Sequence, residues 1–142
     1  VGFSIGKRNK KAFLLAVNNS IQISFFTALI ISFLYLIFFK NIIAIITDVE
    51  ILRFISFKHI FWILIIPPAA SFCYQLDGIF IGASQTSEFR NAMIFSVISF
   101  IIISIYLTKF FTNHGIWLSL LIFMILRALT LKYYFNKILR RF

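Results

Sequence analysis

Long uncharged, apolar stretches alternate along this chain with short segments that carry the charged residues. Four such stretches occur, and the longest runs from Ala12 to Phe39 without a charged side chain. A helix needs about 17–25 largely apolar residues to cross a bilayer, and no apolar–polar alternation with a period of two indicates a transmembrane barrel. The pattern therefore predicts an all-α membrane protein with four transmembrane helices. We place them at approximately residues 19–40, 58–84, 91–109 and 115–135.

The composition supports a membrane location. Hydrophobic residues make up 61% of the 142 residues and charged residues 13%, whereas soluble domains average about 45–50% and 25%. Too few polar residues remain to cover a water-facing surface, and the hydrophobicity is too high for a disordered chain. The net charge of +10 would favour nucleic-acid binding in a soluble protein. Here the basic residues flank the predicted spans, as in membrane proteins, so we expect no nucleic-acid partner.

The distribution of Lys and Arg between the loops predicts the orientation. With four spans both termini lie on one side, which carries ten basic residues against four on the other. Because cytoplasmic loops are enriched in Lys and Arg, both termini should be cytoplasmic. The chain starts with Val1 instead of Met, so we also expect it to be a piece of a longer protein. The ten basic residues are Lys7, Arg8, Lys10, Lys11, Arg90, Arg127, Lys132, Lys137, Arg140 and Arg141.

The connections between the predicted spans contain turn and cap chemistry. Residues 47–50 read Thr-Asp-Val-Glu, which places an N-cap residue and an acid ahead of an apolar segment. This arrangement predicts a short helix on the outer membrane interface. The links at 84–91 and 112–115 are short, so neighbouring spans should be antiparallel.

Asp77 is the one acidic residue inside a predicted span. A carboxylate in the membrane is unfavourable by about 2.5–3.5 kcal/mol on insertion scales, and such residues usually face the bundle interior or a water-filled cavity. If Trp62 marks the outer interface, Asp77 lies about 22 Å further along a helix, in the cytoplasmic half. One interpretation is a carboxylate that binds a proton or a cation. The other is a structural Asp bonded to Tyr74, Gln75 or another helix.

Residues on the same predicted span could shape a binding cavity. Pro67 and Pro68 each remove a backbone hydrogen bond, which predicts a hinge or a break beside a cavity, or else a static kink. Ser71 and Gln75 lie four residues apart on one helical face, and we expect them to line that break with Tyr74. The isolated histidines, His59 and His114, are weak signals. No cluster of residues indicates a catalytic, metal or cofactor site, so we expect no enzyme.

The stretch from Cys73 to Met93 contains a pattern that resembles a known family. It reads L-D-G-x-F-I-G-A at residues 76–83, followed by R-N-x-M at residues 90–93. This pattern is similar to the tenth helix and following loop of multidrug and toxin extrusion (MATE) transporters of the DinF-like branch. Weaker similarities at Val1-Gly2, at residues 117–120 and at residues 126–129 extend the resemblance over most of the chain.

The resemblance implies a fold and a function. Members of the family have twelve helices in two six-helix lobes around a central cavity, and residues 1–142 would supply helices 9–12 of the C-terminal lobe. The family exports organic, often cationic compounds in exchange for Na⁺ or H⁺. Asp77 would then occupy the position where some branches keep an acid on helix ten. The implied partners are membrane lipids, drug-like substrates and helices 1–8, in a bacterial inner membrane, with no cofactor besides the coupling ion.

Two alternatives stay open at this point. A lipid-linked oligosaccharide flippase of the same superfamily would need basic residues inside its cavity to hold a pyrophosphate. The one intramembrane candidate is Arg127, which directly follows the uncharged run 110–126, so we expect it near a helix end, where its side chain can snorkel to the interface. A small four-span structural subunit, complete in itself, is the other alternative. The reading frame upstream of Val1 would distinguish the subunit from a transporter.

Overall fold

The computed structural model describes residues 1–140 and 142, so Arg141, one of the basic residues used for the orientation, lies outside them. Every regular element in the described residues is helical, and four of the helices are long and apolar enough to cross a membrane. The predicted fold class and number of spans are therefore confirmed. The elements are α1 (Gly2–Gly6), α2 (Lys10–Ile46), α3 (Glu50–Lys58), α4 (Ile60–Gly82), α5 (Thr86–Phe111) and α6 (Asn113–Leu139).

Three of the four long helices extend beyond the predicted spans, because an uncharged run marks only the part of a helix that suits hydrocarbon. α2 is the extreme case, with 37 residues. At 1.5 Å per residue it is about 55 Å long, whereas a hydrocarbon core is about 30 Å thick. Its first turns, which contain Lys10 and Lys11, therefore project beyond the apolar segment at the end of the bundle where the chain starts.

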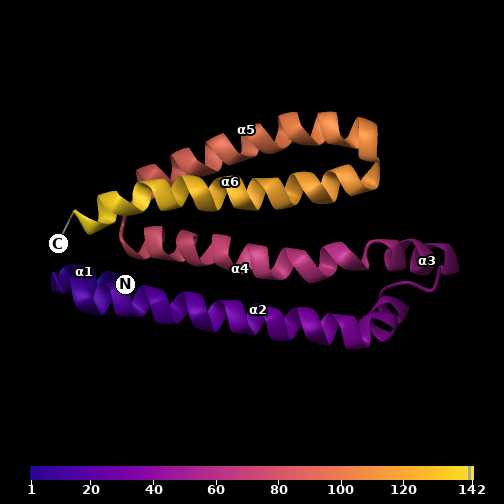
Figure 1. Cartoon of the computed structure of the whole chain (residues 1–142), viewed down its shortest axis with the longest axis horizontal. Coiled ribbons are helices and arrows are strands. Elements are labelled where there is room, and N and C mark those ends of the chain that lie inside the picture. The colour runs from indigo at the N-terminus through magenta and orange to yellow at the C-terminus, as the bar shows by residue number, and fades with distance from the viewer. Residues whose placement is uncertain (141) are drawn as a thin grey trace.

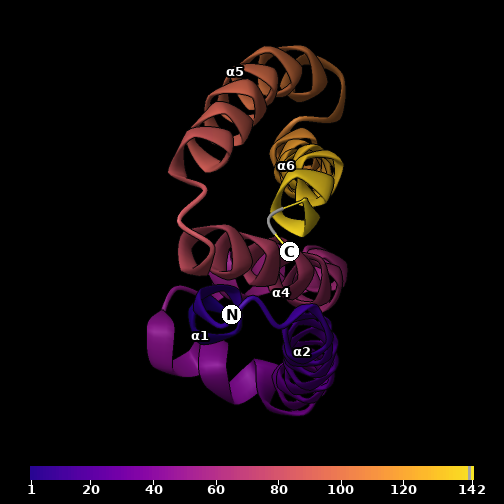
Figure 2. The same cartoon turned by 90° about the vertical axis from the view of Figure 1, so that its left-hand side faces the viewer.

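The long helices lie side by side in the order α5, α6, α4 and α2 (Figure 1; Figure 2). The most extensive contacts join α5 to α6, α2 to α4 and α4 to α6. The central pair, α4 and α6, run in the same direction, while α2 and α5 run the opposite way on either side (Figure 1). Both termini lie at the same end of the bundle (Figure 1), as an even number of spans requires. We call this the termini end and the opposite end the far end.

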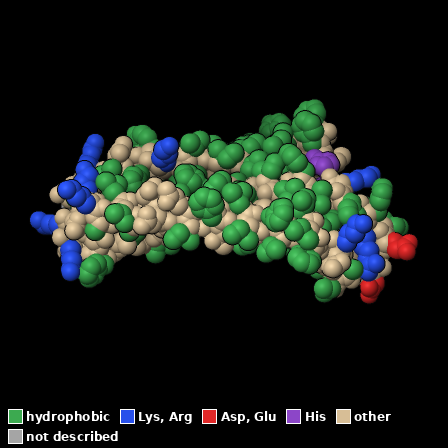
Figure 3. Space-filling view, turned by 60° about the horizontal axis from the view of Figure 1, so that its bottom comes forward, with side chains coloured by type: hydrophobic (Ala, Val, Ile, Leu, Met, Phe, Trp, Pro, Cys, Tyr) green, Lys and Arg blue, Asp and Glu red, His purple; other side chains and the backbone are tan. Residues whose placement is uncertain are grey.

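The outer surface of the bundle is predominantly apolar. Large aliphatic and aromatic side chains are exposed along α2 and α5, and most of the charged side chains visible in Figure 3 gather at the two ends of the molecule. An exposed apolar band between charged ends is unfavourable in water but suits a bilayer. This distribution supports the assignment as a membrane protein.

A compact apolar core closes the termini end. Phe13 of α2, Phe80 of α4 and Leu131 of α6 are each fully buried in one cluster. The ring of Phe13 also contacts those of Phe135 and Phe142, with centroids 5.9 and 5.2 Å apart. Ala92 of α5 belongs to the same cluster, so this core joins all four long helices at the termini end.

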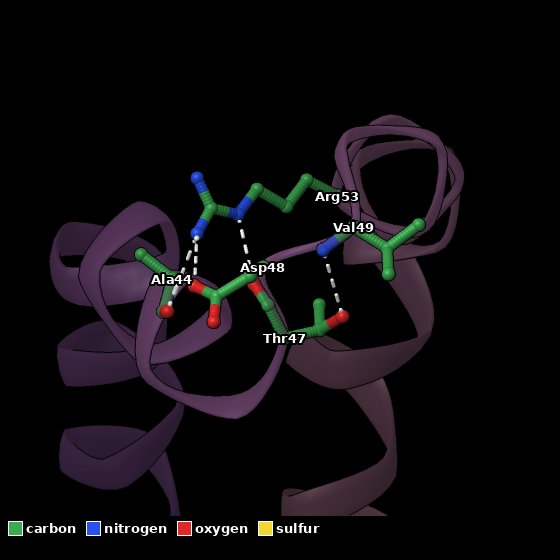
Figure 4. Close-up of polar contacts among 5 residues, drawn as sticks. All are labelled: Ala44, Thr47, Asp48, Val49 and Arg53. Atoms are coloured by element: carbon green, nitrogen blue, oxygen red, sulfur yellow. Dashed lines mark hydrogen bonds and ion pairs between the residues drawn. The ribbon is translucent and has the colours of Figure 1, made fainter.

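A short turn connects α2 to α3 at the far end (Figure 4). Arg53 of α3 donates from Nε to the carbonyl of Thr47 at 2.9 Å and from Nη2 to that of Ala44 at 3.4 Å, and it also contacts Asp48. These bonds satisfy carbonyl groups that the end of α2 leaves open. The short helix predicted here is present, and its location on the membrane interface stays a prediction. Its N-cap residue is Val49, while the Thr47 hydroxyl accepts a bond from the Val49 amide.

The predicted turn between the last two spans is extremely tight. Thr112 alone separates α5 from α6, and its φ of 50° lies in the left-handed region. Two residues into α6, a Cβ on Gly115 would lie 2.4 Å from the carbonyl oxygen of Leu107. Only glycine fits such a close approach of two backbones, so this residue sets the distance between the two helices.

Candidate functional site

Asp77 faces α6, where it forms an ion pair with Arg127. The Asp77 Oδ2 and Arg127 Nη2 atoms lie 2.8 Å apart, and each residue is only 7% exposed. This distance is within the range of a charge-assisted hydrogen bond. The second interpretation of Asp77, in which it bonds to another helix, therefore describes its contact in this structure.

Apolar layers enclose the ion pair on both sides along the helix axes. One turn towards the far end, Cys73 of α4 and Met124 of α6 pack in one buried cluster. One turn towards the termini end, Phe80 and Leu131 belong to the larger core. Because the surroundings are apolar, two unpaired charges would be strongly unfavourable here. Each of the two charges is therefore stabilised in this position by its contact with the other.

One oxygen of the carboxylate and one nitrogen of the guanidinium have no hydrogen-bond partner. These two atoms, Asp77 Oδ1 and Arg127 Nε, are both buried. The guanidinium carbon of Arg127 also lies 5.4 Å from the ring centroid of Phe89 and 5.9 Å from that of Phe123. These distances are at the outer limit of cation–π contacts. The site therefore has an open carboxylate oxygen and aromatic rings around its cation.

The expectation that Arg127 lies near a helix end and snorkels is wrong. The α6 helix continues to Leu139, so Arg127 lies midway along it, and its side chain is buried. The charge of this residue is balanced by Asp77. The residue is thus an intramembrane cation, but in this structure it is not available to hold a pyrophosphate.

A groove with apolar walls and several polar side chains lies on the other side of α4, against α2. Its volume is about 720 Å³. The predicted candidates Ser71, Tyr74 and Gln75 all line it, and Gln75 Oε1 accepts a hydrogen bond of 2.5 Å from the Ser20 hydroxyl. The α2 wall contributes four further polar residues, Asn19, Ser20, Ser24 and Thr27.

The structure therefore divides the predicted site residues between two faces of α4. Ser71, Tyr74 and Gln75 face the groove, while Asp77 is not among its lining residues and contacts α6 instead. Asp77 and Gln75 are two positions apart, which is about 200° around a helix. This angle explains why the two side chains point to opposite neighbours.

The two prolines lie within α4, which continues through them without interruption from Ile60 to Gly82. Pro67 lines the groove, and the Ser71 hydroxyl donates to the carbonyl of Pro68 at 2.8 Å. No break interrupts the helix at this point. The hinge itself concerns movement, so it stays a prediction.

The wall that α2 contributes to the groove was not predicted from the sequence. Ser20, Ser24 and Thr27 are spaced by four and three residues, which places them on one face of a helix. Such a polar line inside an uncharged span was visible in the sequence. It was overlooked because the absence of charge, and not the position of hydroxyl groups, defined the span.

The two histidines, each a weak signal alone, meet at the far end. Their rings stack with centroids 4.5 Å apart. Trp62 Nε1 donates to His114 Nδ1 at 2.9 Å, and the side-chain amide of Asn113 lies 3.1 Å from His59 Nε2. This contact joins the start of α4 to the α5–α6 turn. The sequence did not indicate this contact, because the two histidines are 55 residues apart and the local partner of His59, the carbonyl of Ile55 at 2.9 Å, says nothing about His114.

Comparison with known proteins gives one match. Over 104 residues the chain is 36% identical to "DNA damage-inducible protein F" of Escherichia coli (strain K12). That protein, DinF, is a member of the MATE family. The chain is therefore similar to part of a MATE-family protein. The aligned region covers 73% of this chain and 22% of DinF, so the match spans less than a quarter of the length of this relative. Such a match fits the C-terminal part of a larger protein.

No protein-family model matches the chain, and no solved structure matches it. The relationship to DinF therefore comes from the sequence match. It agrees with the family indicated by the L-D-G-x-F-I-G-A pattern around Asp77.

Proposed function

We propose that this chain forms helices 9–12 of a secondary-active transporter that exports organic, often cationic compounds in exchange for Na⁺ or H⁺. The observation that carries the proposal is the similarity to DinF over 104 residues. A small structural subunit unrelated to transporters would not account for that similarity. The unpaired apolar faces of α2 and α5 would then contact lipid or the remaining helices of the transporter.

The groove between α2 and α4 would form part of the substrate cavity. Ligand pockets in proteins have volumes of about 300–1,000 Å³ and combine apolar walls with a few polar groups, and the groove meets both conditions. Tyr74, which is 59% exposed, offers an aromatic face to an organic cation. Gln75 and Ser71 offer hydrogen-bonding groups beside it.

Asp77 would serve as the cation-binding carboxylate. Intramembrane acids usually mark ion or substrate pathways, and Asp77 Oδ1 has no hydrogen-bond partner in its buried position. An oxygen of this kind can accept a proton or coordinate a small hard cation. Loading it would change the charge balance between α4 and α6.

The location we propose is a bacterial inner membrane, with the termini end in the cytoplasm. The basic residues of the chain favour this orientation, since ten of the fourteen belong to the side that carries the termini. A cysteine-accessibility experiment on intact cells would test it, because a cysteine placed at Lys7 should be protected from an impermeant reagent and one at Lys58 should react.

The transport proposal is tested with the full-length protein in a bacterial strain that lacks its own efflux pumps. Expression should lower the accumulation of a fluorescent organic cation, and dissipating the ion gradients should abolish that effect. Tyr74→Ala should weaken export about fivefold if a cation–π contact of about 1 kcal/mol is lost. Tyr106→Ala is the matched control, since Tyr106 is 62% exposed and lies on α5, away from the groove.

Asp77→Asn provides the second arm of the experiment. It should reduce ion-driven export while the protein still inserts into the membrane at normal levels. Undiminished, ion-coupled export by this variant would remove Asp77 from the mechanism. Equal accumulation with and without the wild-type protein, over a panel of organic cations, would refute the proposed function itself.

A further inference from the structure

Besides the proposed coupling ion, a positive charge of the protein itself is available to Asp77, and a cation-binding site does not need one. Arg127 reaches it from α6 at 2.8 Å and already neutralises the carboxylate. A proton or Na⁺ that binds Asp77 would place two positive charges on one buried carboxylate, which like-charge repulsion opposes. Binding of the coupling ion and contact with Arg127 are therefore in competition.

The atoms left open by the ion pair are suited to such an exchange. Arg127 engages one carboxylate oxygen, and the other, Asp77 Oδ1, is buried without a partner. A cation that enters this buried site would therefore meet an unpartnered carboxylate oxygen before the guanidinium has left. Arg127 Nε is likewise buried without a partner, so the present contact does not satisfy the guanidinium fully.

The displaced guanidinium has a second resting place within reach. The rings of Phe89 on α5 and Phe123 on α6 lie 5.4 and 5.9 Å from its central carbon. Aromatic faces attract a cation most when it is desolvated, and a small shift away from Asp77 would strengthen these contacts. A second position closer to these rings, in addition to the observed one at Asp77, would make this side chain a two-state element.

No other charge in the described residues takes part in this contact. On α4, the thiol of Cys73 lies one turn away and is fully buried, while the phenol of Tyr74, three residues away, lines the groove against α2. On α5, Glu88 precedes Phe89, but it is bonded to Lys137 of α6. The negative charge of Asp77 is therefore neutralised either by Arg127 or by an ion that takes the place of Arg127.

We propose that Arg127 is the resident counter-cation of Asp77 and that it competes with the coupling ion for the carboxylate. Arg127 is then a positioning residue, since it sets the ion concentration at which Asp77 loads and links loading to the contact between α4 and α6. This inference rests on the proposed function, because it assigns a role to the cation site of that transporter.

The test measures cation binding to the full-length protein in detergent, without a transport substrate. Binding of radioactive Na⁺ gives the half-saturating concentration, and the infrared band of a protonated carboxyl group, followed against pH and assigned with Asp77→Asn, reports the proton. Arg127→Gln should lower the half-saturating Na⁺ concentration, or raise the pH of half-protonation, by about tenfold or one pH unit. The arm that responds identifies the coupling ion.

Two further variants separate competition from a structural role. Arg127→Lys keeps the charge, so the half-saturating concentration should change by less than about threefold. Phe89→Leu removes a resting place of the displaced guanidinium and should act in the opposite direction, weakening cation binding by about two- to fivefold. Phe89→Leu also keeps the test decisive if Arg127→Gln fails to fold.

Unchanged cation binding in Arg127→Gln or in Phe89→Leu would overturn the proposal, because a static ion pair predicts no opposite effects of these two variants. Binding that is equally strong in Asp77→Asn would overturn it too, since the cation would then occupy another site. Failure of the wild-type protein to export organic cations contradicts the proposed function, whereas the binding measurements still decide whether Arg127 competes for Asp77.

Discussion

The buried ion pair between Asp77 and Arg127 leads to a quantitative prediction about stability. In Asp77→Leu the carboxylate is replaced by an apolar side chain, and Arg127 keeps only its distant contacts to Phe89 and Phe123. Removing one partner of a buried pair typically destabilises a protein by about 3–5 kcal/mol. We expect a value near 3 kcal/mol, because the two rings still face the guanidinium. At about 2–4 °C per kcal/mol for a chain of this size, the unfolding temperature should fall by roughly 10 °C.

The chain provides its own reporter for this measurement. Cys73 is its one cysteine, it has no exposed surface, and it lies one turn from Asp77. A thiol-reactive fluorescent dye should therefore label the chain in detergent only when the α4–α6 contact opens. Heating the wild type and the variants with this dye gives their apparent unfolding temperatures at the site of interest.

Two matched variants make the result interpretable. Asp48→Leu makes the same substitution at a carboxylate that also contacts an arginine, but the Asp48 side chain is fully exposed, so the unfolding temperature should not change. The double variant Asp77→Leu/Arg127→Met removes both charges, and replacing a buried pair with apolar residues is often neutral. Its unfolding temperature should return to within a few degrees of wild type. If Asp77→Leu is as stable as Asp48→Leu, Asp77 does not balance Arg127.

Three further predictions concern the turns and the ends of helices. Gly115→Ala should push α6 away from α5, because its Cβ would lie 2.4 Å from the Leu107 carbonyl oxygen; overpacking of this kind costs about 1–3 kcal/mol, and a wild-type unfolding temperature would contradict it. Trp62→Phe removes the donor to His114, so hydrogen exchange at the α5–α6 turn should accelerate while the termini end stays protected. Asn9→Ala removes the side chain that accepts from the Ala12 amide at 3.0 Å, and loss of this cap, about 1 kcal/mol, should speed exchange only in the first turn of α2.

The spans could be predicted from the sequence because lipid allows few alternatives. A backbone without water must satisfy its polar groups within each helix, so an uncharged run of about 20 residues leaves little choice of structure. The ends were less predictable. The α2 helix includes Lys10 and Lys11, since basic residues are good helix formers outside the hydrocarbon and an uncharged run contains no information about them.

The arrangement of the candidate site was predictable only for residues whose relative positions follow from the geometry of a single helix. Ser71 and Gln75 face the same groove because four residues make about one helical turn, and this holds in any packing. The partner of Asp77 depends on how α4 is rotated against α6, which the sequence does not reveal locally. Arg127 was misjudged because the uncharged run ends at Leu126, whereas the helix continues for twelve residues beyond Arg127, to Leu139.

The single residue between α5 and α6 restricts how these two helices could move within a larger protein. With Thr112 alone in the link and the backbones in contact at Gly115, these two helices cannot swing apart at the far end. In a conformational change, α5 and α6 would therefore have to move together as one rigid body. Any movement relative to α2 and α4 would then involve the longer connections, residues 47–49 and 83–85, which lie at opposite ends of the bundle.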